Sequence, residues 1–304
     1  MNAKRISVFI TAVMLIIGCV VSVISQVQAA DRRIIITLDP GHGGEDPGSG
    51  TNNPMCERDL NLKIAQYCKE ELETYDNVTV YMTRYDNTDT SLGTKSASLR
   101  KRAEIASNYH SDILVSLHCN AGGGRGAEVW YPNASTYYQE FNSWGGYIAD
   151  LILNQLSALG LRNRGKKIRD CTDNERYPDG SLADYYTVMN AARRYGVLCL
   201  IVEHAFVDTD DYDNFLNTDE KLKNLGVADA TALAQNFALQ KKVPPYTAGD
   251  LNYDGEIDVR DLIALEKQVA SGTVLTQKGP ADVNGDGVLD QNDIVALKKI
   301  LIGV

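Results

Sequence analysis

Three histidines and a glutamate follow or end apolar segments that lie far apart in the chain. His42 occurs in "ITLDPGHGGEDPG", residues 36–48, which begins with the pattern of a strand and continues as a loop rich in glycine and proline. His118 ends the segment "ILVSLH", and Glu203 and His204 end "VLCLIVEH". Imidazole and carboxylate groups gathered in one place can bind a metal ion or transfer protons. The sequence therefore predicts a metal site or an acid–base site, provided that the fold brings these segments together.

The elements that must position these residues follow an alternating pattern. Apolar β-branched runs predict strands at 34–38, 78–82, 113–117, 127–131 and 197–202, and helical spacing predicts helices at 60–72, at 99–108 and within 137–159. Buried strands separated by helices are typical of an α/β fold with a mostly parallel or mixed sheet and helices on both faces. Ligands bind at the carboxyl ends of the strands in such sheets. Residues 160–185 have no pattern that we can assign.

Neighbouring residues of a strand point to opposite faces of the sheet, so only one of Glu203 and His204 can face the site. We expect Glu203 to face it and His204 to pack on the other face, and His204 is the alternative site residue. The fourth histidine, His110, lies in "SNYHSD" between a predicted helix and a predicted strand. We expect His110 at the surface.

Several motifs occur in the order seen in one family of secreted zinc enzymes. They are "LDPGHGG", "CERDLNLKIA", "TR" at 83–84, "LRKRAEIAS", "VSLHCNA" and "LIVEHAF". Residues 33–240 thereby resemble the N-acetylmuramoyl-L-alanine amidases of the amidase-3 type. The resemblance implies one catalytic zinc ion bound by His42, Glu57 and His118, with Glu203 as the catalytic carboxylate. It also implies hydrolysis of the amide between N-acetylmuramic acid and L-alanine in peptidoglycan.

Other interpretations of these residues remain open at this stage. Glu57 by its position alone would be an acidic residue in the first turn of a helix, where it interacts with the helix dipole. The segment after Glu203 departs from the commoner family pattern E-x-G-F-x-x-N, since Ala205 and Asp208 replace the glycine and the asparagine. The run "GGGRG" at 122–126 is either part of the cleft rim, with its arginine near a peptide carboxylate, or a plain turn. A zinc peptidase that cuts another bond of the stem peptide and a non-catalytic wall-binding module are the alternative functions.

An internal repeat occupies the end of the chain. "DLNYDGEIDVRDLIAL" begins at residue 250 and "DVNGDGVLDQNDIVAL" begins at residue 282. Oxygen side chains fall at positions 1, 3, 5, 9 and 12 of each copy, and glycine stands at position 6, which is the spacing of a calcium-binding loop. The predicted ligands are Asp250, Asn252, Asp254, Asp258 and Asp261, with Asp282, Asn284, Asp286, Asp290 and Asp293, and position 7 (Glu256, Val288) contributes its backbone carbonyl. We expect two structural calcium ions.

This duplicated loop-helix unit resembles a dockerin domain, a small all-α module that binds a cohesin module of a scaffold protein, as in cellulosomes. The resemblance covers about 247–304. It implies that positions 10 and 11 of each loop recognise the cohesin, which here are Val259 with Arg260 and Gln291 with Asn292. The two pairs differ between the repeats.

The first thirty residues predict that the protein is secreted. Residues 1–30 combine a basic start, an apolar run and small residues before Asp31, which predicts a secretory signal peptide; an uncleaved membrane anchor and a lipobox ending at Cys19 are the alternatives. We expect no membrane insertion after cleavage, a catalytic domain over 31–240, a linker over 241–249 and the dockerin over 250–304. The formal net charge of −10 argues against a nucleic-acid partner. Of the five remaining cysteines, Cys68 and Cys199 are predicted to be buried.

Overall fold

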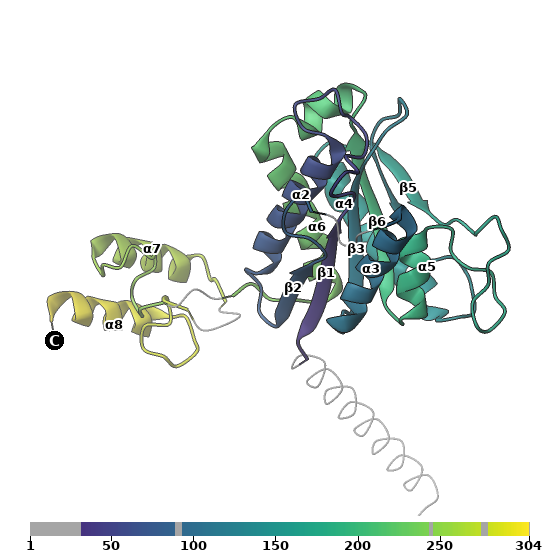
Figure 1. The fold of residues 1–304 in the computed structure, drawn as a ribbon. Coiled ribbons are helices and arrows are strands. Elements are labelled where there is room, and N and C mark those ends of the chain that lie inside the picture. The colour runs from purple at the N-terminus through teal and green to yellow at the C-terminus, as the bar shows by residue number, and fades with distance from the viewer. Residues whose placement is uncertain (1–31, 89–92, 243–245, 275–278, 304) are drawn as a thin grey trace, which may run out of the picture. The chain divides into compact units, whose positions relative to one another are not determined.

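The computed structural model describes residues 32–88, 93–242, 246–274 and 279–303, which belong to two compact units (Figure 1). One unit ends at Gln240 and the other begins at Lys241. The predicted signal peptide, the alternative membrane anchor and the lipobox at Cys19 all lie outside the described residues. Within the described ranges, no helix has both the length and the apolar character needed to cross a bilayer.

A six-stranded mixed sheet forms the centre of the first unit, in the order β2-β1-β3-β6-β4-β5. The strands are β1 (Ile34–Pro40), β2 (Val78–Met82), β3 (Ile113–Asn120), β4 (Ala127–Trp130), β5 (Asn163–Lys167) and β6 (Leu198–Phe206). β1, β2, β3 and β6 run parallel, whereas β4 pairs antiparallel with β6 and parallel with β5. β4 runs opposite to β3 and β6 because the connection from β3 to β4, residues 121–126, is short, whereas a crossover to a parallel strand needs a dozen or more residues.

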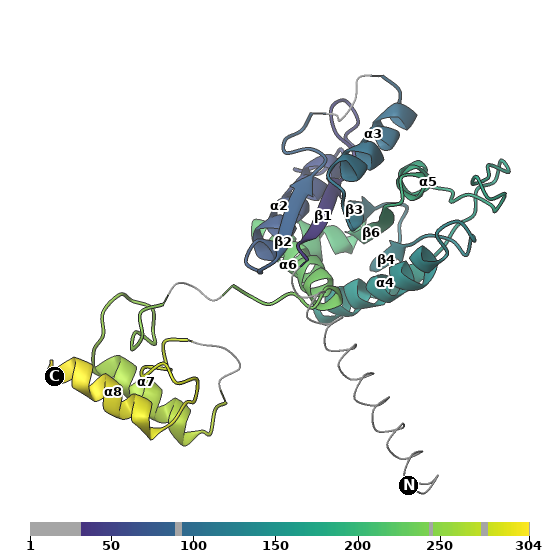
Figure 2. The ribbon, with the colours of Figure 1, turned by 90° about the horizontal axis from the view of Figure 1, so that it is seen from below.

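Helices cover both faces of this sheet, as the sequence predicts (Figure 2). On one face lie α2 (Glu57–Leu72), α4 (Glu140–Ala158) and α6 (Asp219–Asn236), and on the other lie α3 (Lys95–Asn108) and α5 (Thr187–Arg194). In β6, Leu198, Leu200 and Val202 belong to the core on the first face, and Cys199 and Ile201 belong to the core on the second. Apolar side chains are therefore needed at every position, which explains the unbroken apolar run.

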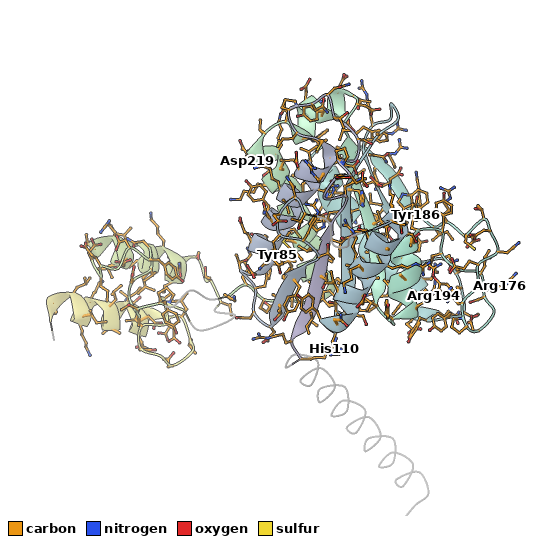
Figure 3. All side chains as sticks on the ribbon, in the orientation of Figure 1. Tyr85, His110, Arg176, Tyr186, Arg194 and Asp219 are labelled. Carbon is orange, nitrogen blue, oxygen red and sulfur yellow. The ribbon has the colours of Figure 1, made fainter. Side chains whose placement is uncertain are left out.

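The structure extends two predicted strands, adds one strand and confirms the predicted burial or exposure of three residues. β3 and β6 extend to Asn120 and Phe206, so His118 and Glu203 lie inside paired strands rather than beyond them, because the ladder continues through the pair His118–Glu203. The unassigned residues 160–185 contain β5, an edge strand with the polar sequence NRGKK. Buried Cys68 and Cys199 and exposed His110 agree with the predictions (Figure 3).

The second unit has two helices, α7 (Val259–Ala270) and α8 (Gln291–Ile302), one after each repeat loop. A capping box starts each helix, formed by Asp258 with Asp261 in the first and by Asp290 with Asp293 in the second. Leu265, Ala281, Ile294 and Leu297 form its small buried core. This all-α unit matches the predicted fold class.

Candidate metal centre and active site

The turn after β1 lifts His42 away from the sheet. His42 has φ 64, a left-handed backbone conformation that is uncommon for a residue with a side chain. Glycines make room for the neighbouring site residues: a Cβ on Gly41 would lie 2.2 Å from the ring of His118, and a Cβ on Gly48 would lie 2.6 Å from Oε2 of Glu57. The glycine-rich loop therefore allows the close approach of three functional side chains.

Glu57 is the first residue of α2, but its carboxylate makes no capping hydrogen bond to the start of that helix. The N-cap residue Cys56 makes no side-chain capping bond, and Oε2 of Glu57 accepts a hydrogen bond of 2.9 Å from the backbone N–H of Ser49. Glu57 is only 4 % exposed, which is unusual for a glutamate in a first helical turn. Its other oxygen, Oε1, points toward the two histidines.

His42, Glu57 and His118 converge at one point. Oε1 of Glu57 lies 3.0 Å from Nε2 of His42 and 3.1 Å from Nδ1 of His118, and one donor atom from each residue lies within 4.8 Å of the others. In the described part of the chain, no other group of three or more histidines, cysteines and acids converges in this way. The turn, the start of α2 and the end of β3 each contribute one side chain, so this site exists only in the folded protein.

The electrostatics of this cluster favour the charged carboxylate. Burial raises the pKa of Glu57, but hydrogen bonds with His118 and His42 outweigh that effect and hold the pKa well below its usual range. Burial lowers the pKa of His42, yet Glu57 and Asp46 together raise it above its ordinary value. Nδ1 of His42 lies 3.0 Å from Asp46, although the alignment falls short of a hydrogen bond.

Two buried arginines hold the backbone of the turn from below. Arg102 donates hydrogen bonds to the carbonyls of Pro40 and His42 at 2.8 and 2.5 Å, and Arg84 donates to the carbonyls of Pro40 and Gly41 at 3.0 and 2.9 Å. Burial and the charge of Arg102 lower the pKa of Arg84 to about 10. These contacts keep His42 in its strained conformation. Sequence reasoning assigned them no role, although both arginines belong to the quoted motifs "TR" and "LRKRAEIAS".

Glu203 faces the same side of the sheet as the cluster. It lines a cavity of about 1020 Å³, together with His42, His118, Tyr186, Val188 and Ile201 among others. Burial raises the pKa of Glu203 well above its ordinary value, and the carboxylates of Glu57 and Glu128 raise it further. A carboxyl group with a raised pKa beside a cavity is suited to accept and return a proton.

His204 packs on the opposite face, fully buried and away from the cavity. Its Nε2 lies 2.8 Å from Oδ2 of Asp229 on α6, and its Nδ1 lies 2.9 Å from the carbonyl oxygen of His118. Burial lowers the pKa of His204, but Asp229 raises it above its ordinary value. The side chain thus connects α6 to β3 from behind the site.

The glycine run at 122–126 belongs to the connection between β3 and β4 and is not among the residues that line the cavity. Oδ2 of Asp208 accepts hydrogen bonds from the N–H groups of Gly122 and Gly123 at 2.7 and 3.0 Å, and Arg125 pairs with Asp210. The segment after β6 binds this run, and its interpretation as part of the cleft rim stays a prediction. The aspartate that replaces the family asparagine has a clear role in this contact.

The donor set fits a zinc ion. Two imidazole nitrogens and one carboxylate oxygen are the ligands of a catalytic zinc site, which leaves a further position for water or substrate. The carboxylate is oriented by the N–H of Ser49, and such outer contacts are typical of metal ligands. The site also opens to the cavity that contains Glu203.

The two repeat loops of the second unit have matching geometry. Gly255 and Gly287 adopt φ 86 and 83, as position 6 of a calcium loop requires. The position-1 aspartates, Asp250 and Asp282, each accept a hydrogen bond from that glycine's N–H. Oδ1 of Asp282 is buried, and the described residues offer it no hydrogen-bond partner. An unpartnered buried carboxylate oxygen is costly in water-free surroundings, so the loop fits a cation.

Comparison with known proteins decides the family. The family model described as N-acetylmuramoyl-L-alanine amidase matches residues 36–235, and the model described as dockerin type I domain matches residues 248–302. The chain belongs to the N-acetylmuramoyl-L-alanine amidase family. It carries a dockerin type I domain at its end.

The relatives of this amidase-family chain cover most of its first unit. It is 29 % identical over 212 residues to the sporulation-specific N-acetylmuramoyl-L-alanine amidase of Bacillus subtilis. The aligned region covers 68 % of this chain and 69 % of that protein. The solved structure of Cwp6 from Clostridium difficile has a TM-score of 0.54 and 26 % identity, covering 67 % of this chain and 29 % of that one. An N-acetylmuramoyl-L-alanine amidase from Clostridium difficile 630 has the same fold, with a TM-score of 0.53, 23 % identity, and coverage of 68 % and 98 %.

In the dockerin domain, the four residues expected at the cohesin surface are all exposed. Val259 is 60 % exposed, and Gln291 and Asn292 lie in the first turn of α8. Arg260 differs from the others because its guanidinium pairs with Asp254 and Asp258 of its own loop. The two repeats thus present different side chains at equivalent positions.

Proposed function

We propose that this chain is a secreted, zinc-dependent N-acetylmuramoyl-L-alanine amidase that hydrolyses the amide between N-acetylmuramic acid and L-alanine in peptidoglycan. The observation that carries the proposal is the convergence of His42, Glu57 and His118 beside Glu203 in a chain of this family. A bound zinc ion would polarise the substrate carbonyl and lower the pKa of water.

The residues of this chain would bind the metal and transfer the protons. His42, Glu57 and His118 would hold the metal, and Glu203 would act as general base and then as general acid. Glu203 would take the proton of the attacking water and return it to the amine of the leaving L-alanine. A raised pKa makes the carboxylate a stronger base toward the attacking water, and the proton that it takes would pass to the nitrogen as the C–N bond breaks. The substrate would bind in the cavity of about 1020 Å³ that Glu203 lines together with His42 and His118.

The proposal extends to the organisation of the whole chain. Residues 1–30 would be a signal peptide, 31–240 the catalytic domain, 241–249 a linker and 250–304 the dockerin domain. Two calcium ions would stabilise the repeat loops, and the dockerin would bind a cohesin module through Val259, Arg260, Gln291 and Asn292. The enzyme would then act outside the cell, in association with a scaffold protein.

Digestion of purified peptidoglycan tests the proposed activity. Mass spectrometry should find intact stem peptides with new L-alanine amino termini, and addition of a zinc chelator should abolish them. Cleavage between two amino acids of the stem would indicate a zinc peptidase instead. Binding of peptidoglycan with no released product, even with added zinc, would indicate a wall-binding module.

A further inference from the structure

A segment without regular secondary structure is held firmly beside the cavity. We call residues 168–186, which connect β5 to α5, the arm. Its end is fixed by Asp184, which is 1 % exposed and accepts hydrogen bonds from Arg193 at 3.1 Å and from Tyr177 at 2.6 Å. The backbone N–H of Asn133 also donates to Asp184, at 2.6 Å. These buried charge-assisted contacts fix the arm's last residues in place.

The arm places Tyr186 in the cavity wall, and Tyr185 and Arg169 stack next to it. Tyr186 lines the cavity and packs edge-on against Trp130, with ring centroids 5.2 Å apart (Figure 3). The guanidinium of Arg169 stacks 3.5 Å above the ring of the adjacent Tyr185. Burial raises the pKa of the Tyr186 hydroxyl, and a hydrogen bond with Arg169 partly offsets this. The ring of Tyr185 in turn packs edge-on against that of Tyr186, with centroids 5.2 Å apart, so Arg169 is connected to the cavity wall through these two rings.

Four basic residues in or beside the cavity are paired with carboxylates. Lys167 and Arg164 both contact Glu128, at 2.6 and 2.7 Å. Of the basic residues that line the cavity, Arg102 pairs with Asp39 at 2.7 Å and Lys95 with Asp46 at 3.7 Å. Arg169 is exposed and pairs with no carboxylate in the described part of the chain. In a protein of net charge −10, an unneutralised arginine at a cavity margin is a distinctive feature.

We infer that Arg169, held by Tyr185 and Tyr186, is a subsite that binds a carboxylate of the substrate's stem peptide. The inference rests on the proposed function for the identity of the substrate, and it adds that the enzyme prefers stem peptides with free carboxyl groups over amidated ones. The planar arginine fork binds a carboxylate in a charge-assisted, two-point geometry, and stacking on an aromatic ring keeps the fork oriented. An amide carries no charge and loses this interaction.

The test compares two ligands that differ only in charge. One is a stem tripeptide with its carboxyl groups free, and the other is the same peptide with all of them amidated. Both lack the muramoyl bond, so calorimetry measures binding without turnover. The unchanged chain should bind the free acid about tenfold more tightly than the amide. Arg169→Ala should bring the ratio of the two affinities close to one, and Arg169→Lys should give an intermediate ratio, because it keeps the charge without the fork.

Arg176→Ala is the matched control, because it removes the same charge from the same arm. Arg176 donates to the carbonyl of Gly180 within the arm and does not line the cavity (Figure 3). This variant should keep the tenfold preference. A preference that survives in Arg169→Ala, or equal binding of both peptides by the unchanged chain, would overturn the inference.

The same pair of peptides attached to N-acetylmuramic acid separates this inference from the proposed function. Hydrolysis of either muramoyl peptide establishes the activity independently of Arg169. If neither is hydrolysed while the free acid still binds more tightly and the difference disappears in Arg169→Ala, the proposed function fails and the carboxylate subsite stands. If both are hydrolysed and the peptides bind equally, the function stands and the subsite fails.

Discussion

The cluster of His42, Glu57 and His118 depends on single residues that would be unfavourable elsewhere. His42 adopts a left-handed backbone, and Glu57 is a buried acid whose carboxylate faces two imidazoles. A backbone in this region costs about 1–3 kcal/mol for most residues, and a buried charge is tolerated only with partners. Such a combination is expected where function requires it.

His118 should be needed for metal binding at the residue scale. Its Nδ1 and the Nε2 of His42 approach the same oxygen of Glu57, so removal of one imidazole leaves two donors. We expect His118→Ala to lose stoichiometric zinc and activity together, measured by metal analysis after dialysis and by release of L-alanine amino termini. Retention of one zinc per chain with full activity would show that the ligand set is different.

Glu203 should be needed for the reaction and not for the metal. Glu203→Gln keeps the shape of the side chain and removes the proton acceptor. We expect one zinc per chain, unchanged peptidoglycan binding, and a rate lower by about 10²–10⁴-fold. Near-normal turnover would mean that another group is the base, and His204→Ala would then be the variant to compare.

At the scale of elements, a buried ion pair joins β1 to α3. Nη1 of Arg102 lies 2.7 Å from Oδ1 of Asp39, and Ser116 and Thr83 donate to the same carboxylate at 2.6 Å each. Burial raises the pKa of Asp39, but Arg102 and these hydrogen bonds together hold it below its ordinary value. The turn that bears His42 begins directly after this pair.

This pair should make the first unit less stable in acid. Because the pKa of Asp39 is lower in the folded state, its stabilisation is complete above the unfolded value of about 3.8 and is lost as the pH falls through the folded value. Denaturant unfolding of the metal-free chain between about pH 6 and 3 should show this decline. Asp39→Asn should be less stable by about 3–5 kcal/mol at neutral pH, since it leaves Arg102 buried without its charge partner. The same acid dependence in Asp39→Asn as in the unchanged chain would contradict this assignment.

At the scale of the whole molecule, the two units should respond to different metals. The second unit has a small core, and its loops gather many carboxylates, of which Asp250, Asp261, Asp282 and Asp293 are buried. Like charges packed together repel one another unless a cation binds. Its stability should therefore depend on calcium, whereas that of the first unit should depend on zinc.

Calorimetry of the full chain can separate these responses. Metal-free protein supplied with zinc alone should have the amidase activity and one unfolding transition, and added calcium should create or raise a second transition. Mass action predicts about 2.7 kcal/mol of stabilisation at a ligand concentration 100 times the dissociation constant. Asp282→Ala should weaken the calcium response and leave the rate of hydrolysis unchanged. A calcium-independent second transition would contradict the calcium sites.

The sequence by itself determined the elements and the types of residue that could bind metal. Local periodicity predicted β2 with its observed bounds, and the repeat predicted a helix after each of its two loops. These features are local, because a strand, a capping box or a twelve-residue loop depends on nearby positions. The opposite orientations of Glu203 and His204 follow from the same local rule.

Only the tertiary structure decided which distant residues meet. The contact of Glu57 with two histidines needs the start of α2 to pack against the ends of β1 and β3, and residue spacing carries no record of that packing. The buried arginines under the turn and the arm beside the cavity were likewise hidden, since Arg84 and Arg102 contact the turn across 43 and 60 positions, and the arm contacts Asn133 across 51. The sequence does not show whether a polar residue is solvated or buried. The fold decides which partners form hydrogen bonds with a buried polar residue.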